Sequence, residues 1–231
     1  MKVAVIVFPG SNCDHDAYFA YKKILGQETD FVWHKEGDLS GYELIVLPGG
    51  FSYGDYLRCG AIARLSPVMQ EVVRRARAGV KVLGICNGFQ ILTESGLLPG
   101  ALMMNINRKF ICKDVHVRVD NNQSVFSHLC AGEEVLQIPI AHSEGNYYCS
   151  KEDLEALEEN KQIIFRYCTP DGTVTAESNP NGSIHNIAGI INSDGNVLGM
   201  MPHPERNVEK LIGNADGKKI LASLLENFVR N

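Results

Sequence analysis

The first half of the chain alternates between short, continuously apolar segments and longer segments in which apolar residues recur at helical spacing. Apolar segments without alternation are typical of strands with both faces buried. The pair Ser66-Pro67 is a helix-start signal. The pattern predicts strands at 2–8, 31–33, 43–47 and 80–85, and helices at 13–25, at 67–78 and from about residue 89. This order predicts a mostly parallel sheet with helices on both faces.

The pattern changes from about residue 110, where helix candidates become rare. Residues 193–196 (Ser-Asp-Gly-Asn) lie between two apolar runs and give a hairpin signal. We expect strands at 115–119, 135–140, 163–167, 187–192 and 197–201, and helices at 151–159 and 215–229. No linker or repeat interrupts the chain. We therefore predict a single α/β domain, 1–231, with a flavodoxin-like three-layer core, a mostly parallel central sheet and a mixed, more antiparallel second half.

Composition and charge exclude several classes of function. The 231 residues are 45% hydrophobic and carry a net charge of −5, from 22 Lys and Arg against 27 Asp and Glu. This balance argues against nucleic acid or an anionic membrane as the main partner. The apolar run at residues 3–8 is too short for a secretory signal. Seven cysteines, without a Cys-x-x-Cys pair, indicate reduced thiols and no zinc site. We expect a cytoplasmic protein.

The segment Gly84-Ile85-Cys86-Asn87-Gly88 has the form of a nucleophile elbow. It follows an apolar strand, opens a helix and places glycine on both sides of Cys86. Such a turn forces its central residue into strained backbone geometry, and small neighbours avoid clashes. The start of a helix also favours a thiolate. Cys86 is therefore the candidate nucleophile, although a cysteine after an apolar strand is usually a small buried hydrophobe.

The segment Pro202-His203-Pro204-Glu205 supplies the groups that activate a thiol. Proline biases the preceding residue toward extended backbone, in which alternate residues face the same side. On this argument His203 and Glu205 project together, with His203 as general base and Glu205 as the carboxylate that orients it. Alone, Pro-His-Pro is typical of a rigid surface turn. The two motifs together predict a nucleophile–base–orienter triad that attacks a carbonyl carbon.

The loop at residues 48–60 is rich in glycine. Gly49 and Gly54 have the separation found in phosphate-binding P-loops, but Asp55 stands where that motif needs lysine. We interpret the loop as the source of a backbone oxyanion donor beside Cys86, because glycine permits close approach. A flexible turn is the alternative.

These motifs resemble those of the class I, or triad, glutamine amidotransferases, in which a cysteine elbow, a Pro-Gly-Gly loop and a late His-x-Glu occur in this order. Within that family, the chain is similar to the glutaminase subunits of phosphoribosylformylglycinamidine synthases. The resemblance spans essentially the whole chain and rests on residues 9–14, 49–58, 86–90, 142–146 and 201–206.

The resemblance implies hydrolysis of the glutamine side-chain amide, with ammonia passed to a separate ATP-using synthetase that aminates formylglycinamide ribonucleotide in purine biosynthesis. It implies a large synthetase subunit and a small accessory subunit as partners. ATP and Mg²⁺ are then used by the synthetase, and this chain needs no metal or organic cofactor. The family's roles fall on Cys86 (nucleophile), His203 (base and acid), Glu205 (orienter), the N–H groups of Gly50 and Asn87 (oxyanion donors), and Gln90, His142 and Ser143 (substrate pocket).

Two other functions fit parts of the sequence. A stand-alone cysteine hydrolase or isomerase on the same fold would use the same triad but would work at full rate without a partner. A non-catalytic binding module would carry Cys86 as a structural residue. Ammonia release by the purified chain favours the first of these, and failure of Cys86 to react with a glutamine-like electrophile favours the second.

Overall fold

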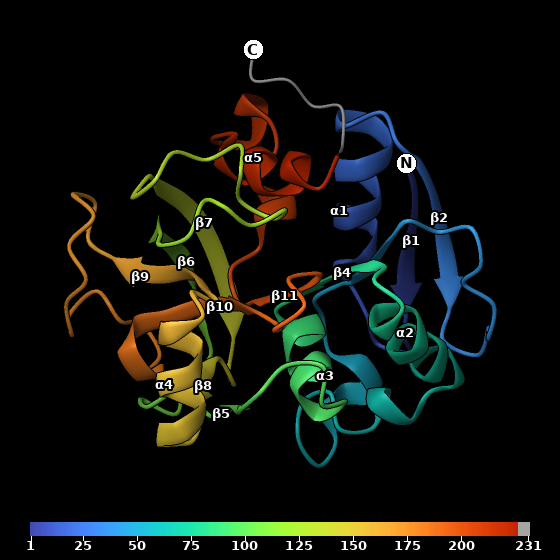
Figure 1. The fold of residues 1–231 in the computed structure, drawn as a ribbon, viewed down its shortest axis with the longest axis horizontal. Helices are drawn as coiled ribbons and strands as arrows, with labels where there is room; N and C mark the ends of the chain where they lie inside the picture. The colour runs from blue at the N-terminus through green and yellow to red at the C-terminus, as the bar shows by residue number, and fades with distance from the viewer. Residues whose placement is uncertain (226–231) are drawn as a thin grey trace.

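A nine-stranded sheet crosses the molecule in the order β2-β1-β3-β4-β11-β10-β9-β6-β7 (Figure 1). The computed structural model describes residues 1–225. The strands of this sheet are β1 (Lys2–Val7), β2 (Glu28–Trp33), β3 (Leu44–Leu47), β4 (Lys81–Ile85), β6 (Ile111–Val119), β7 (Val135–His142), β9 (Ile163–Cys168), β10 (Ile187–Ile191) and β11 (Val197–Met200). The first five strands in this order are mutually parallel, and the remaining pairings are antiparallel. The predicted fold class is confirmed.

The parallel half coincides with the continuous apolar runs of the sequence. All four residues of β3 and residues 3–6 of β1 are fully buried, since these strands are covered on both faces. The strand predicted at 31–33 begins earlier, at Glu28. Its first residues were missed because β2 is an edge strand with polar, partly exposed positions at Glu28 and Asp30.

Helices cover the sheet on both sides. They are α1 (Asp14–Phe19), α2 (Pro67–Arg77), α3 (Asn87–Glu94), α4 (Lys151–Glu159) and α5 (Asp216–Ser223). Figure 1 shows α1 and α5 on one side of β4, β10 and β11, and α2 and α3 on the other. The helix predicted at 13–25 is α1 followed by a π-helical turn, η1 (Ala20–Ile24). The helix predicted at 215–229 ends at Ser223, and its residues 226–229 lie outside the described part of the chain.

The second half contains the predicted hairpin, because β10 and β11 are antiparallel and Ile191 pairs with Leu198. A small separate sheet, β5 (Ala101–Met103) with β8 (Asn146–Tyr148), was not predicted, since three-residue strands leave no periodicity to recognise. The ring of Phe89 on α3 stacks on Tyr147 of β8 at a centroid distance of 5.8 Å, which packs this small sheet against the elbow helix.

Buried apolar side chains from both halves belong to one cluster. The assignment of the whole chain to one domain stays a prediction from the sequence. Within residues 1–225, every helix is too short or too polar to cross a lipid bilayer.

Candidate active site

Cys86 lies at a sharp turn between β4 and α3. Its φ and ψ are +51° and −105°, a conformation that costs an L-residue about 1–3 kcal/mol. Its N–H donates to the carbonyl of Met200 at 2.7 Å, and its own carbonyl accepts from the N–H of Phe89 at 2.9 Å. These bonds to β11 and α3 hold the turn in place. The expected strained elbow is present, with Cys86 4% exposed.

The glycines of the elbow allow α3 to approach the sheet closely. A Cβ on Gly88 would lie 2.0 Å from the carbonyl oxygen of Leu47, and a Cβ on Gly84 would lie 2.5 Å from Cδ1 of Leu92. Contacts of this length do not occur, so any larger residue would push α3 away from β3 and β4. The close approach fixes the start of α3 directly after Cys86, where unpaired backbone N–H groups favour negative charge.

His203 and Glu205 form a buried pair immediately after β11. The Nδ1 of His203 lies 2.7 Å from Oε1 of Glu205, and both side chains are almost wholly buried. The expectation of an extended segment was wrong, because residues Pro204–Arg206 form a 3-10 turn, η5. A proline suits the first position of such a turn, since its fixed φ is helical and its missing N–H needs no partner. The turn brings the carboxylate back to the imidazole.

Strand β7 contacts both Cys86 and His203. The N–H of His203 donates to the carbonyl of Pro139 at 2.8 Å, and Sγ of Cys86 lies 3.6 Å from the carbonyl oxygen of Ala141. Cys86, the candidate nucleophile, follows a strand of the parallel half of the sheet, whereas these two carbonyls come from its antiparallel end. The site therefore lies where the antiparallel end of the sheet contacts residues that follow β4 and β11.

Burial and charge act in opposite directions on His203. Burial disfavours the imidazolium, but the charges of Glu205 and Cys86 outweigh it, so the pKa of His203 lies well above its ordinary value. Among the described residues, Oε2 of Glu205 has no hydrogen-bond partner. A protonated His203 places a positive charge beside the candidate nucleophile.

The Gly49–Gly50 turn lies against His203 and Cys86. A Cβ on Gly49 would stand 2.6 Å from Cε1 of His203 and 3.4 Å from Cβ of Cys86. The carbonyl of Gly49 accepts a hydrogen bond from the N–H of Cys13 at 3.3 Å. In a trans peptide the N–H of Gly50 points away from that carbonyl, so this bond sets the direction of the predicted oxyanion donor. Gly50 has a φ of +133°, which requires glycine.

Gln90 and Asn87 are bonded to each other on α3. The amide of Asn87 donates to Oε1 of Gln90 at 2.8 Å, and the amide of Gln90 donates to the carbonyl of Glu144 at 2.6 Å. Both side chains are buried. The side chain of Gln90 thus connects the elbow helix to the loop after β7 and holds that loop.

His142 and Ser143 lie at the end of β7. The Nδ1 of His142 lies 3.1 Å from Oδ1 of Asn105, while the backbone carbonyl of the exposed Ser143 accepts from the N–H of Asn105 at 2.8 Å. Burial, followed by the charge of His203, lowers the pKa of His142 to about 4. His142 is therefore a neutral, buried neighbour of His203.

Cys13 lies beside the triad and was given no role from the sequence. It is 2% exposed, and its Sγ accepts a hydrogen bond from Nη2 of Arg206 at 3.0 Å. One ligand atom each from Cys13, His203 and Glu205 can be chosen so that all lie within 4.8 Å of one another. A cavity of about 240 Å³ opens onto Cys13 and His203, with Phe51 also in its wall. The residues that neighbour Cys13 in the sequence do not indicate that it lies beside His203 and Glu205.

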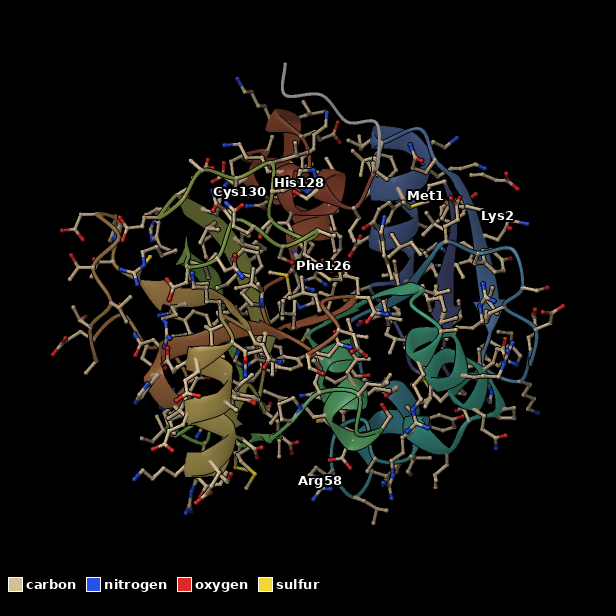
Figure 2. All side chains as sticks on the ribbon, viewed as in Figure 1. Met1, Lys2, Arg58, Phe126, His128 and Cys130 are labelled. Atoms are coloured by element: carbon tan, nitrogen blue, oxygen red, sulfur yellow. The ribbon has the colours of Figure 1, made fainter. Side chains whose placement is uncertain are left out.

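The loop after Gly50 is anchored at one end and exposed at its tip. Arg58 forms a two-point ion pair with Glu94 of α3, with Nε–Oε1 and Nη2–Oε2 distances of 2.5 and 2.8 Å. Figure 2 shows Arg58 at the lower edge of the molecule. The neighbouring Leu57 is 92% exposed and has a φ of +70°. The loop that follows Gly50 therefore presents an apolar, strained tip to solvent.

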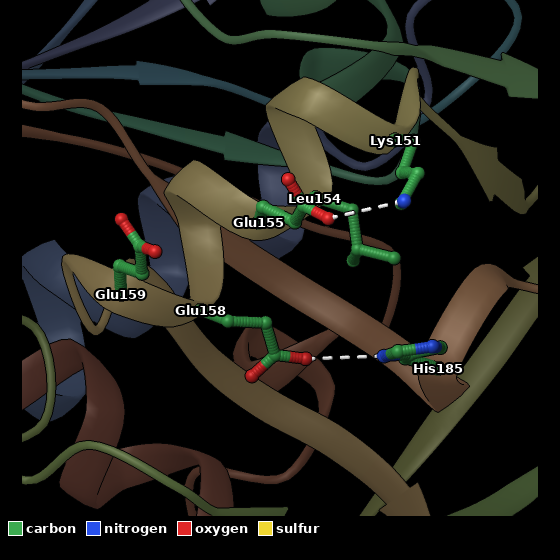
Figure 3. A pocket seen from close by; sticks show the side chains of 6 residues that line it. All are labelled: Lys151, Leu154, Glu155, Glu158, Glu159 and His185. Carbon is green, nitrogen blue, oxygen red and sulfur yellow. Dashed lines mark hydrogen bonds and ion pairs between the residues drawn. The ribbon is translucent and has the colours of Figure 1, made fainter.

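A separate hollow of about 450 Å³ lies between α4 and the turn at His185, and shares no residue with the triad (Figure 3). The pairs Lys151–Glu155 and His185–Glu158, at 3.5 and 3.1 Å, are its ionic contacts. All four side chains are exposed, so these pairs contribute little to stability, and we assign this hollow no function.

The glutamine amidotransferase resemblance is borne out by comparison with known proteins. The model of the CobB/CobQ-like glutamine amidotransferase domain matches residues 1–223. The phosphoribosylformylglycinamidine synthase subunit PurQ of Moorella thermoacetica is 58% identical over 230 residues, covering 100% of this chain and 98% of that protein. The subunit of the same name from Gloeobacter violaceus is 57% identical over 225 residues, covering 97% of each.

Among solved structures, the chain is similar to one in the structure of PurLQS from Thermotoga maritima. The TM-score is 0.86 and the sequence identity 46%, over 97% of both chains. The fold and the sequence therefore point to the same set of relatives.

Proposed function

The chain belongs to the CobB/CobQ-like glutamine amidotransferase family, and on this premise we propose that it is the glutaminase subunit of a phosphoribosylformylglycinamidine synthase. It hydrolyses glutamine to glutamate and delivers the ammonia to a synthetase subunit, which converts formylglycinamide ribonucleotide into formylglycinamidine ribonucleotide with ATP. Identity of 57–58% over nearly the full length of two proteins of that name carries this proposal.

In the proposed reaction the Cys86 thiolate attacks the side-chain amide carbon of glutamine. The imidazolium of His203 gives its proton to the leaving ammonia, and a thioester remains on Cys86. The neutral imidazole then takes a proton from water, and the resulting hydroxide releases glutamate and restores the thiolate and imidazolium. The raised pKa of His203 supports this starting state. Glu205 keeps the ring oriented through Nδ1.

We propose the N–H groups of Gly50 and Asn87 as donors to the oxyanion of each tetrahedral intermediate. The carbonyl of Gly49 is turned toward Cys13, which supports a Gly50 N–H directed to the other side of the peptide. Gln90, His142 and Ser143 are proposed to border the glutamine pocket. The buried bonds of Gln90 support a role in holding the loop at Glu144.

The partner of the chain is proposed to be a large synthetase subunit, with a small accessory subunit completing the assembly. The similar structure from Thermotoga maritima is that of PurLQS, which supports this composition. ATP and Mg²⁺ are proposed to act on the synthetase, and no metal or organic cofactor is needed on this chain for glutamine hydrolysis. The cytoplasm is its proposed location.

Reconstitution of the complex tests this function. The chain is combined with the synthetase and accessory subunits of its own cell, and amination of formylglycinamide ribonucleotide is measured with glutamine or with ammonium as nitrogen source. Cys86→Ser should abolish the glutamine-dependent reaction and leave the ammonium-dependent reaction intact, because a hydroxyl is far less nucleophilic than a thiolate. Cys112→Ser, at an exposed thiol, is the matched control.

Two outcomes would contradict the proposal. Equal loss of both reactions in Cys86→Ser would show that the chain does more than supply ammonia. Full-rate glutamine hydrolysis by the chain alone would favour the stand-alone hydrolase.

A further inference from the structure

Cys13 places a second thiol against the catalytic histidine, and glutamine hydrolysis uses only one. Its Sγ lies 3.3 Å from the point where a Cβ on Gly49 would stand, and that same point is 2.6 Å from Cε1 of His203. Ligand atoms of Cys13, His203 and Glu205 lie within 4.8 Å of one another, and all three side chains are buried.

This set of donor atoms is the set that zinc prefers. Zn²⁺ binds cysteine sulfur, histidine nitrogen and carboxylate oxygen, and sites with three protein ligands keep a fourth position open. Its bond lengths of about 2.0–2.3 Å place tetrahedral ligand atoms roughly 3.3–3.8 Å apart. A cluster already within 4.8 Å therefore needs side-chain movements of about 1 Å to close on the ion.

One buried polar atom of the cluster, Oε2 of Glu205, has no partner among the described residues. Buried polar atoms are rarely left unpaired, and each such case calls for an explanation. A cation supplies one, because its charge compensates a buried carboxylate and a thiolate at the same time.

The structure shows a cavity through which an ion can reach the cluster, and a side chain that competes with the ion for the sulfur of Cys13. The cavity of about 240 Å³ has Cys13 and His203 in its wall, which is room for an ion with water, since one water takes about 30 Å³. Arg206 competes for the same sulfur through its 3.0 Å hydrogen bond. Its Nε also lies 3.4 Å from Oδ2 of Asp16, so a neighbouring acid can retain the guanidinium when an ion takes the sulfur.

We propose that Cys13, His203 and Glu205 form a binding site for a thiophilic divalent cation such as Zn²⁺, and that its occupation stops glutamine hydrolysis reversibly. On binding, the thiol of Cys13 releases its proton to solvent and its sulfur coordinates the ion. The histidine then cannot transfer protons. Cation binding does not depend on the proposed function, whereas the inhibition rests on it.

Cobalt is the probe for binding, because a thiolate bound to Co²⁺ gives a charge-transfer absorption in the near ultraviolet. The full chain with Cys86→Ser is titrated with Co²⁺, so that the nucleophile cannot contribute the band. We expect one Co²⁺ per chain and displacement by Zn²⁺. The band should disappear in Cys86→Ser/Cys13→Ala and persist in Cys86→Ser/Cys112→Ala, which removes an exposed thiol from the wall of the same cavity.

Circular dichroism checks that each variant is folded. If Cys13→Ala is not, Cys13→Ser replaces it, since a hydroxyl keeps the size and polarity of the group but is a poor zinc ligand. A band of equal strength without Cys13, or no band in Cys86→Ser, would overturn the site.

Inhibition is measured as glutamine hydrolysis in the assembled complex, relative to the zinc-free rate of each variant. Zn²⁺ should inhibit the natural chain and Cys112→Ala alike, with recovery on adding EDTA. Inhibition of Cys13→Ala to the same degree should require at least about 10-fold more Zn²⁺. Altering even an outer group of a metal site lowers metal affinity by this factor. Equal sensitivity of Cys13→Ala and the natural chain would overturn the inhibitory role. A complex without glutaminase activity would instead refute the proposed function, while the cobalt titration would still decide the site.

Discussion

Cε1 of His203 lies 2.6 Å from the position that a Cβ on Gly49 would occupy. Gly49→Ala should therefore displace the imidazole and reduce kcat/KM for glutamine about 100-fold or more, as expected for a 1 Å misplacement of a catalytic group. Gly37→Ala is the control, because nothing lies within 4 Å of a Cβ there. Steady-state glutaminase assays of both variants check this, and equal activity of the two would show that His203 tolerates the methyl group.

Glu205→Gln should slow thiol chemistry at neutral pH. The charge of Glu205 raises the pKa of His203, so its loss weakens the imidazolium that stabilises the Cys86 thiolate. In the natural chain, brief alkylation near pH 7, followed by peptide mapping, should label Cys86 ahead of the exposed Cys112, since an ordinary cysteine has a pKa of about 8.5. In Glu205→Gln this preference should shrink at pH 7.

The effect of Glu205→Gln should vanish near pH 10, where thiolates form without help. Turnover of the variant should still exceed that of Cys86→Ser, because an orienting group assists and does not attack. If Cys86 were labelled equally in Glu205→Gln and in the natural chain at every pH, Glu205 would have no electrostatic effect on the thiol.

His142 should make the fold sensitive to mild acid. Its folded pKa is about 4, against 6.5 for a free imidazole. Between these values the unfolded chain binds a proton that the folded chain does not, so the free energy of unfolding falls as pH decreases from about 6.5 to about 4. The full shift is worth about 3 kcal/mol.

Urea unfolding at about pH 7.5 and about pH 5 tests this effect. The asparagine in His142→Asn cannot titrate, so this variant should lose less unfolding free energy between the two pH values than the natural chain. His15→Asn, at a side chain that is 82% exposed, should behave like the natural chain. An identical pH dependence in all three proteins would show that His142 is protonated as easily folded as unfolded.

The isolated chain should be a poor glutaminase that the synthetase activates. The carbonyl of the Gly49–Gly50 peptide accepts a hydrogen bond of 3.3 Å from the N–H of Cys13, and glycine permits a peptide flip at little cost. A flipped peptide would direct a carbonyl at the oxyanion, and loss of one donor costs about 100-fold or more. Binding of the synthetase near the exposed tip at Leu57 would select the productive orientation.

Glutamine hydrolysis is therefore measured with and without the synthetase, the accessory subunit and nucleotide. Leu57→Ser removes apolar surface from the tip and should weaken activation by the synthetase, with Leu211→Ser, at a distant exposed leucine, as control. Equal rates for the isolated and assembled chain would contradict this gating.

Local features of the site were predictable from the sequence, because they depend on neighbouring residues. The strained turn at Cys86 follows from an apolar strand, two glycines and a helix start within a few positions. The pairing of His203 with Glu205 was predicted from an extended backbone, whereas a 3-10 turn produces it. The pairing was right and its geometry wrong, since proline is compatible with both conformations.

Contacts between distant segments were not predictable in the same way. Cys13 and Arg206 are 193 positions apart, and their contact depends on how α1 packs against η5. A cysteine in a loop gives no sign of such a neighbour in a single sequence. The short strands β5 and β8 and the polar start of β2 were missed for a related reason, because tertiary pairing and not side-chain periodicity defines them.

The contact of β7, at the antiparallel end of the sheet, with residues that follow strands of the parallel half makes this site divisible in a controlled way. A break in the loop between β5 and β6 would leave Cys86 and Gly49 on one polypeptide, and His203 and Glu205 on the other. Neither fragment would hold a nucleophile together with its base. Recovery of glutaminase activity on mixing would then report reassembly of the two polypeptides, which makes the chain a candidate for use as a split reporter of association between proteins fused to its halves.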